Sequence, residues 1–406
     1  FIKNLNVFSN LKFRVSYGET GNQGIGSYRT KAKLSSYKYP FAGSMSNGVS
    51  YEEWRGPVSA DLKWETTAQI DAGVDIGVLD NRLTLTIDYY HKKTRDLLQE
   101  VKIPQSTGFT NMMTNSGYVT NDGWEFSLNY AVLTKTPLKW NLNANLSFNK
   151  NKIGGLNADQ FAQKLWNGSD QVFIQRNGCP IGALYGYVED GFFDNEEEVR
   201  AFKQYANATD ATVKSMVGEV KYCDFDGDGY ITDKDRRIIG DTNPAYTWGL
   251  TNNFSYKNIS LSFLLQGSHG NDIYNGNLLD VTMGNIGNIP TFAYNSRWTP
   301  ETASTAKWPR ATAGYSRNML ISDRYVEDGS YVRLKNISLS YDWRHPVKYI
   351  ENVKFTFQAT NVFTITDYSW FDPDVNAFGT DASRRGVDIY SYPSARTFAL
   401  GVDLTF

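Results

Sequence analysis

Alternation of apolar and polar residues with a period of two recurs along most of the chain. Segment 11–17 reads LKFRVSY, in which every second residue is apolar, and segment 398–406, FALGVDLTF, has the same pattern. The pattern also occurs at 68–78, 83–89, 124–132, 140–148, 246–256 and 259–265. The apolar phase of these segments contains no charged residue, and Asn252 is its one polar residue. Because successive side chains of a strand point to opposite faces, the pattern predicts strands with one face that never meets water.

The connections between the predicted strands distinguish two folds that both hide one face of a sheet. The predicted strands are 11–18, 65–79, 82–93, 118–133, 138–150, 245–256, 259–268, 328–343, 351–363 and 395–406. The short connections are DNR near residue 80, TKTP at 134–137, KN at 257–258 and HPVKYIEN at 345–352. These alternate with long connections, and short periplasmic turns opposite long outer loops are typical of outer-membrane barrels. The sequence predicts an all-β, antiparallel transmembrane β-barrel with long extracellular loops, of which 151–244 is the longest.

Charge and histidine content argue against two function classes. The 41 basic and 43 acidic residues nearly cancel, which disfavours a nucleic-acid partner. His91, His269 and His345 are the only histidines, and none lies in a nucleophile motif, so we expect no enzymatic activity. Cys179 and Cys223 could form a disulfide or remain free thiols.

The stretch DFDGDGYITDK, residues 224–234, has the spacing of a calcium-binding loop once Asp235 is included. Asp224, Asp226 and Asp228 occupy positions one, three and five of such a loop, and Asp235 occupies position twelve. The carbonyl of Tyr230 would supply the ligand at position seven. We expect these five residues to hold a structural calcium ion; the alternative is an acidic turn whose carboxylates only stabilise local folding.

The flanks of this loop differ from those of a calcium sensor. Gly240 and Pro244 leave at most one or two helical turns after the loop. The side that enters the loop is predicted to be helical, because Asp194 and Asn195 could cap the acidic segment that follows them. We therefore expect the loop to stabilise a long extracellular connection.

Five stretches of the chain together resemble the SusC/RagA family of TonB-dependent outer-membrane transporters. They are LKFRVSYGETGNQGIGSY, DLKWETTAQIDAGVDIGVLDNRLTLTIDYYHKKTRDLL, GEVKYCDFDGDGYITDKDRRIIGDTNPAYTWGL, YVRLKNISLSYDW and NVFTITDYSWFDPD. The resemblance covers essentially the whole chain and implies a 22-stranded barrel with an N-terminal plug. Residues 1–406 would then form the C-terminal ten or so strands, and the absence of an initiator methionine suggests a fragment or a processed portion.

The resemblance also implies a function and partners. It implies active import of glycan oligosaccharides or peptides, driven through TonB and assisted by a SusD-like surface lipoprotein. Membrane lipid would contact the barrel, and the N-terminal plug and barrel portion of the same transporter would complete it. The alternative is a soluble, calcium-stabilised β-rich adhesin or carbohydrate-binding module.

Aromatic and acidic residues of the predicted outer loops are candidates for substrate contact. Rings stack on the CH-rich faces of sugars and peptides, while carboxylates accept hydrogen bonds from their polar groups. The candidates are Trp166, Trp298, Trp308, Trp370, Phe371, Asp372 and Tyr392. Each of them could instead pack within a loop or contact the lipoprotein.

Overall fold

The structure is a computed structural model and divides into two compact units. It describes residues 7–24, 34–51, 57, 59, 61–109, 111–164, 171–282, 288–312, 317–379 and 381–406. Unit 1 comprises Phe1–Ser127, Asn149–Gln160 and Arg176–Pro180, and unit 2 comprises Leu128–Phe148, Phe161–Gln175 and Ile181–Phe406.

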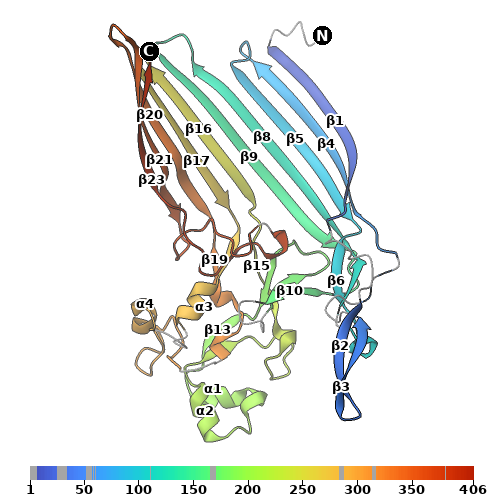
Figure 1. Ribbon diagram of the computed structural model, residues 1–406. Helices are drawn as coiled ribbons and strands as arrows, with labels where there is room; N and C mark the ends of the chain where they lie inside the picture. The colour runs from blue at the N-terminus through green and yellow to red at the C-terminus, as the bar shows by residue number, and fades with distance from the viewer. Residues whose placement is uncertain are drawn as a thin grey trace. The chain divides into compact units, whose positions relative to one another are not determined.

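Ten long strands of the described residues form one antiparallel sheet in the order β1-β4-β5-β8-β9-β16-β17-β20-β21-β23 (Figure 1). Their bounds are β1 Phe8–Asn22, β4 Glu65–Val78, β5 Leu83–Arg95, β8 Tyr118–Leu133, β9 Leu138–Gly154, β16 Tyr246–Tyr256, β17 Ile259–His269, β20 Tyr331–Val347, β21 Ile350–Thr366 and β23 Thr397–Thr405. The ten strands predicted from the alternation are confirmed.

One predicted turn is wrong in length. The segment 345–352 was expected to be a connection, but β20 continues to Val347 and β21 begins at Ile350. Val347 pairs with Ile350 across the hairpin, so the connecting residues are only Lys348 and Tyr349. The register shift between Arg344 and Val347 marks an irregularity that lets the strands continue through this polar sequence.

The apolar phase of the strands forms a continuous, exposed surface within each unit. In unit 2, Tyr341 pairs with Phe355, which pairs in turn with Val402, so apolar side chains form rows across the strands. Leu400 is 86% exposed and Val402 is 60% exposed. In unit 1, Val15 on β1 is 81% exposed. In a sandwich a second layer would cover such a face, whereas here it is uncovered.

The opposite phase of the strands is polar. In unit 1, the Arg14 guanidinium contacts the carboxylates of Asp75 at 3.0 Å and Asp88 at 2.8 Å. In unit 2, Ser262 donates a hydrogen bond of 2.8 Å to Asn253. The sheet therefore has one apolar and one polar face, as a barrel wall between lipid and an aqueous lumen requires.

The buried apolar core of unit 2 lies in the connections between the long strands. Its members are Val172, Phe173, Leu184, Tyr274, Leu278, Leu279, Ile321, Tyr325 and Val387. Small sheets frame this core: β12 Ala183–Gly186 pairs with β11 Gln171–Gln175 and β15 Arg237–Asp241, and β18 Asp272–Asn275 pairs with β19 Val326–Asp328 and β22 Val387–Asp388. Burial of apolar side chains away from water thus stabilises the connections, whereas the apolar face of the sheet stays exposed.

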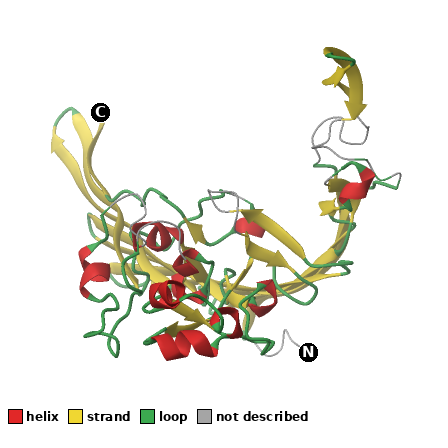
Figure 2. Cartoon of the chain, turned by 90° about the horizontal axis from the view of Figure 1, so that it is seen from below, coloured by secondary structure: helices red, strands yellow, loops and turns green. Residues whose placement is uncertain are grey.

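The remaining elements also belong to connections. They are β2 Leu34–Phe41, β3 Ser44–Tyr51, β6 Leu98–Lys102, β7 Asn111–Asn115, β10 Gln160–Lys164, β13 Glu189–Phe192, β14 Val220–Tyr222, α1 Glu196–Ala201, α2 Asp210–Met216, α3 Gly276–Thr282 and α4 Thr291–Asn295. Within unit 2, all of these helices lie in the long connections, and the long strands run without helical interruption (Figure 2). No helix in the described residues has the length and apolarity needed to cross a membrane.

Candidate functional site

The loop predicted to bind calcium, residues 224–235, brings three carboxylates together. Oxygen atoms of Asp224, Asp226 and Asp235 lie within 4.8 Å of one another. The two oxygens of Asp224 accept hydrogen bonds from the backbone N–H groups of Gly227 at 2.8 Å and Gly229 at 2.7 Å. These bonds fold the loop around its first carboxylate and hold the inner acidic side chains close to one another.

Asp228 and Tyr230 lie in the same loop but outside that group of three. Asp228 accepts a hydrogen bond of 2.8 Å from the backbone N–H of Tyr230. The ring of Tyr230 lies 5.4 Å from the Lys203 ammonium. Gly229, between Asp228 and Tyr230, has a φ of +82°, and a Cβ on it would lie 2.5 Å from the Cβ of Lys203. Only glycine therefore fits this position of the loop.

Asp235 is the most enclosed carboxylate of the loop, with its side chain fully buried. Burial raises the pKa of Asp235, but the backbone N–H groups of Thr232 and Phe225 outweigh it, so the pKa lies below its usual range. These N–H groups donate to Asp235 at 2.8 and 2.9 Å. An ionised, buried carboxylate beside two others fits a hard divalent cation, which prefers several oxygen ligands.

The segments around the loop agree only partly with the sequence prediction. Asn195 caps α1 by accepting a hydrogen bond of 2.9 Å from the backbone N–H of Glu198, as expected. However, α2 and the strand β14 follow α1, so the chain enters the loop from a strand and not from a helix. The last three residues of the loop, Asp233–Asp235, form a single 3₁₀ turn that leads into β15. The fully buried Val220 and Tyr222 explain why the entering segment is a strand.

The aromatic candidates for substrate contact occupy different environments. Trp298 is buried and donates a hydrogen bond of 3.0 Å from Nε1 to Asp194. Trp308 packs against the unit 2 core, and the Arg324 guanidinium lies 5.3 Å from its ring. Both rings are therefore engaged in packing of the connections. Trp166 lies outside the described residues.

Of the three remaining aromatic candidates, Phe371 and Tyr392 are exposed and Trp370 is partly buried. Phe371 is 73% exposed and meets the partly buried Trp370 edge to face, with ring centroids 5.3 Å apart. Tyr392 is 91% exposed. A substrate role for these residues stays a prediction.

Asp372, also a candidate for substrate contact, is held inside the connection between β21 and β23. It forms an ion pair with Arg333 of β20, and both side chains are almost fully buried. Burial raises the pKa of Asp372, but the backbone N–H groups of Asp374 and Ser394 and the Arg333 guanidinium together lower it below its usual range. Arg333 also donates a hydrogen bond of 2.9 Å from Nε to Thr364. The pair fastens this connection to the polar face of the sheet.

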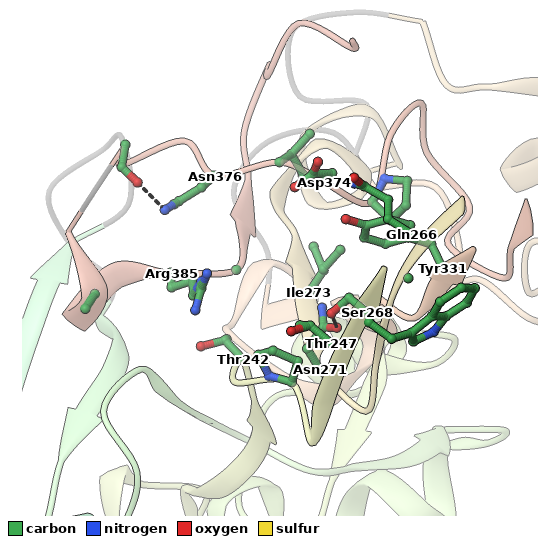
Figure 3. Close-up of a pocket in the computed structure, with 18 of the residues that line it drawn as sticks. Thr242, Thr247, Gln266, Ser268, Asn271, Ile273, Tyr331, Asp374, Asn376 and Arg385 are labelled. Atoms are coloured by element: carbon green, nitrogen blue, oxygen red, sulfur yellow. Dashed lines mark hydrogen bonds between the residues drawn. The ribbon is translucent and has the colours of Figure 1, made fainter. Parts of the chain in front are cut away.

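A polar cavity of about 730 Å³ lies next to this ion pair, within unit 2 (Figure 3). Strands contribute side chains of their polar phase, including Thr247, Gln266 and Ser268, and the connection before β23 contributes Asp374, Asn376 and Arg385. The volume is typical of small-molecule sites. The cavity is at the ends of β16, β17 and β20 that join the long connections.

None of the residues proposed as substrate contacts lines this cavity. The sequence selected aromatic residues and Asp372 of the predicted outer loops and missed the polar phase at the strand ends. That signal was present, because Gln266 and Ser268 continue the phase of Ser260 and Ser262 in β17. The contribution of residues 373–386 depends on how their connection folds back, which alternation does not encode.

Comparison with known proteins finds similarity to TonB-dependent receptors. A family model described as TonB dependent receptor-like, beta-barrel matches residues 4–177. TonB-dependent receptor P3 of Formosa agariphila is 34% identical, in an alignment that covers all of this chain and 40% of that protein. TonB-dependent receptor SusC of Bacteroides thetaiotaomicron is 30% identical, with 38% of that protein covered. Over its whole length the chain is similar to TonB-dependent receptors, SusC among them.

The structure supports the same assignment at the level of fold. The RagAB peptide importer in its open-open state matches all of the chain with a TM-score of 0.77 and 24% identity, over 41% of that importer chain. The chain spans about 40% of the length of the curated relatives. This similarity indicates an outer-membrane protein, and the curated relatives are named as TonB-dependent receptors.

Proposed function

We propose that this SusC/RagA-family chain forms part of the wall and outer loops of a TonB-dependent transporter that imports nutrients. The observation that carries the proposal is the contrast between the two faces of the ten-stranded sheet. Apolar residues such as Leu400, which is 86% exposed, form one face, and polar residues form the other. A lipid bilayer on one side and an aqueous lumen on the other account for both faces.

The sheet needs further strands to form a transport barrel. Within the described residues, β1 and β23 are the edges of the sheet. Unpaired backbone groups are costly in hydrocarbon, so membrane sheets close into barrels. We therefore assign the closing strands, the plug and the contact with TonB to an N-terminal portion of the same transporter. In this arrangement residues 1–406 are the C-terminal part of the barrel, and 151–244 form an extracellular loop region.

The family resemblance and the polar cavity support the proposed substrate class. SusC/RagA-type transporters are expected to import oligosaccharides or peptides with a SusD-like lipoprotein at the cell surface. The RagAB structures are named as those of a peptide importer. The cavity of about 730 Å³ is lined by amide, hydroxyl and charged side chains, which suit either substrate class.

Calcium would stabilise the extracellular loop region without taking part in transport. Asp224, Asp226 and Asp235 would hold the ion, with Asp228 and the carbonyl of Tyr230 completing the shell as the loop adjusts. A bound cation would neutralise the clustered carboxylates and favour the folded loop over the unfolded one.

Uptake in the native organism tests the proposed function. A strain that lacks the gene should lose growth on one class of oligosaccharide or peptide, and the complete gene should restore growth only when TonB is functional. Mild detergent extraction of outer membranes should recover the chain with a plug-containing portion and a lipoprotein, identified by mass spectrometry. Recovery from the soluble fraction alone, with growth unaffected, would contradict the proposal.

A further inference from the structure

The polar cavity of unit 2 contains an arginine whose charge the fold does not use. The side chain of Arg385 is exposed and lines the cavity. Among the residues that the structure describes, Arg385 has no hydrogen bond or ion pair. Its neighbour Arg384 is different, because it pairs with Asp381 at 2.6 Å. A guanidinium without a partner at the wall of a cavity is available to a ligand.

The backbone around Arg385 is fixed, although its side chain is free. The carbonyl of Gly386 accepts a hydrogen bond of 2.8 Å from the backbone N–H of Tyr274. The next residue, Val387, is fully buried and pairs with Tyr274 in the parallel ladder between β22 and β18. Binding at Arg385 would therefore require ordering of one side chain and not of a loop, which reduces the entropic cost.

Asp374 supplies the opposite charge to the same cavity. It lies 3.5 Å from Nη1 of Arg333, but Arg333 makes its closer contact with the buried Asp372. The single positive charge of Arg333 therefore faces two carboxylates, those of Asp372 and Asp374. The side chain of Asp374 is 49% exposed, and Arg333 does not balance its negative charge. Figure 3 shows Asp374 and Arg385 on different sides of the cavity.

The rest of the lining suits peptide groups better than the faces of sugar rings. Asn145 and Gln266 offer amide groups that can pair with a peptide backbone. The amide of Asn376 is already bonded to the backbone of Phe378 and Gly379. Sugars are commonly held on free aromatic faces, but the ring of Tyr331 in this lining already lies 5.0 Å from the Arg333 guanidinium. The other ring, Trp248, belongs to the apolar phase of β16 and packs directly on Gly267, where an added Cβ would lie only 2.5 Å from Nε1 of the indole.

We propose that this cavity is a subsite for short peptides with free ends, in which Arg385 pairs with the substrate carboxylate and Asp374 pairs with an ammonium group. The proposal rests on the proposed import function and narrows its substrate class. The same pair of charges would also accept an oligosaccharide that carries both a uronate and an amine, so the test must separate the two sources.

The test uses the complete receptor that contains this chain, purified in detergent. The probes are a pool of tripeptides with randomised side chains, the same pool amidated at its C-terminus or acetylated at its N-terminus, and pools of neutral and of zwitterionic oligosaccharides. Bound molecules are quantified by mass spectrometry in competition. For the wild type we expect amidation or acetylation to weaken binding about ten- to hundredfold, since each removes a charge-assisted contact.

Variants assign each effect to one side chain. Arg385→Gln should bind free and amidated tripeptides equally, and Arg385→Lys should keep the preference for the free carboxylate. Asp374→Asn should lose the discrimination against acetylated peptides and leave the effect of amidation unchanged. Arg344→Gln, at the opposite end of β20 and likewise exposed, is the matched control and should behave as wild type.

The outcomes separate the subsite from the proposed function. Unchanged discrimination in Arg385→Gln, or preferential binding of either oligosaccharide pool, would overturn the peptide subsite while leaving nutrient import in place. A receptor that binds none of the pools and supports no TonB-dependent growth would overturn both.

Discussion

At the scale of single residues, the buried pair between Arg333 and Asp372 makes the clearest stability prediction. Replacing Asp372 with Asn leaves the Arg333 guanidinium buried without its closest counter-charge, and removing one partner of a buried pair typically costs about 3–5 kcal/mol. We expect the connection 367–396 to become sensitive to protease while the barrel strands remain protected. Asp367→Asn, in the same connection but at its start, is the control.

The same residue predicts how this connection responds to acid. The pKa of Asp372 in the folded protein lies below its ordinary value of 3.8, so its contribution to stability is complete above that value. The contribution is lost as the pH falls through the lower, folded-state pKa. The protection of backbone amides in 367–396, relative to their intrinsic exchange rates at each pH, should therefore fall below about pH 4. In Asp372→Asn the exchange should already be fast at neutral pH. If this variant still lost protection in acid as the wild type does, other groups would be responsible for the acid sensitivity of the connection.

At the scale of elements, the apolar face of the sheet predicts where a charge is tolerated. Arginine at Leu400, in the middle of β23, would face hydrocarbon and should cost about 2–4 kcal/mol. Arginine at Thr356, on the polar phase of the paired strand β21, should cost little. Urea unfolding of the complete receptor in lipid vesicles measures both, and equal costs would mean that the two faces do not meet different solvents.

The loop 224–235 makes a second prediction at this scale. Removing calcium with a chelator should increase hydrogen exchange in 224–241 and lower the melting temperature of the connections of unit 2. The variant Asp235→Asn should show the same exchange with or without calcium, because the most buried of the three carboxylates is gone. Asp233→Asn, exposed on the 3₁₀ turn that ends the loop, should keep the calcium response.

The elements also explain which parts of the fold could be predicted from sequence. The long strands were predictable because a two-residue period separates their faces, as Leu400 and Gly401 illustrate. The small sheets around the unit 2 core were not, since β22 has only two residues and its pairing with β18 depends on a distant segment. The burial of Arg333 was also hidden, because in sequence it is one more polar residue of an alternating strand. The carboxylates of the predicted calcium loop were identifiable because their spacing is local.

At the scale of the whole molecule, two parts of the chain are suited to different environments: the connections of unit 2 to water, and the apolar face of the sheet to lipid or detergent. The connections of unit 2 bury apolar side chains against one another, as a water-soluble domain does. The sheet instead presents apolar side chains outward, so it depends on lipid or detergent. Lowering the detergent concentration should therefore aggregate the protein through the sheet before the connections unfold. Light scattering and near-ultraviolet circular dichroism, recorded together, would detect that order.

The location of the core in the connections has a consequence for biogenesis. If the connections reach the cell surface, the segments that form the core must first pass the bilayer, and a compact body with its own helices and sheets is too large to slip between lipids. Residues such as Tyr274 and Val387 would then cross as extended chain and find each other only on the far side. Closure of this core would be among the last steps of assembly, after the strands on either side of it have inserted.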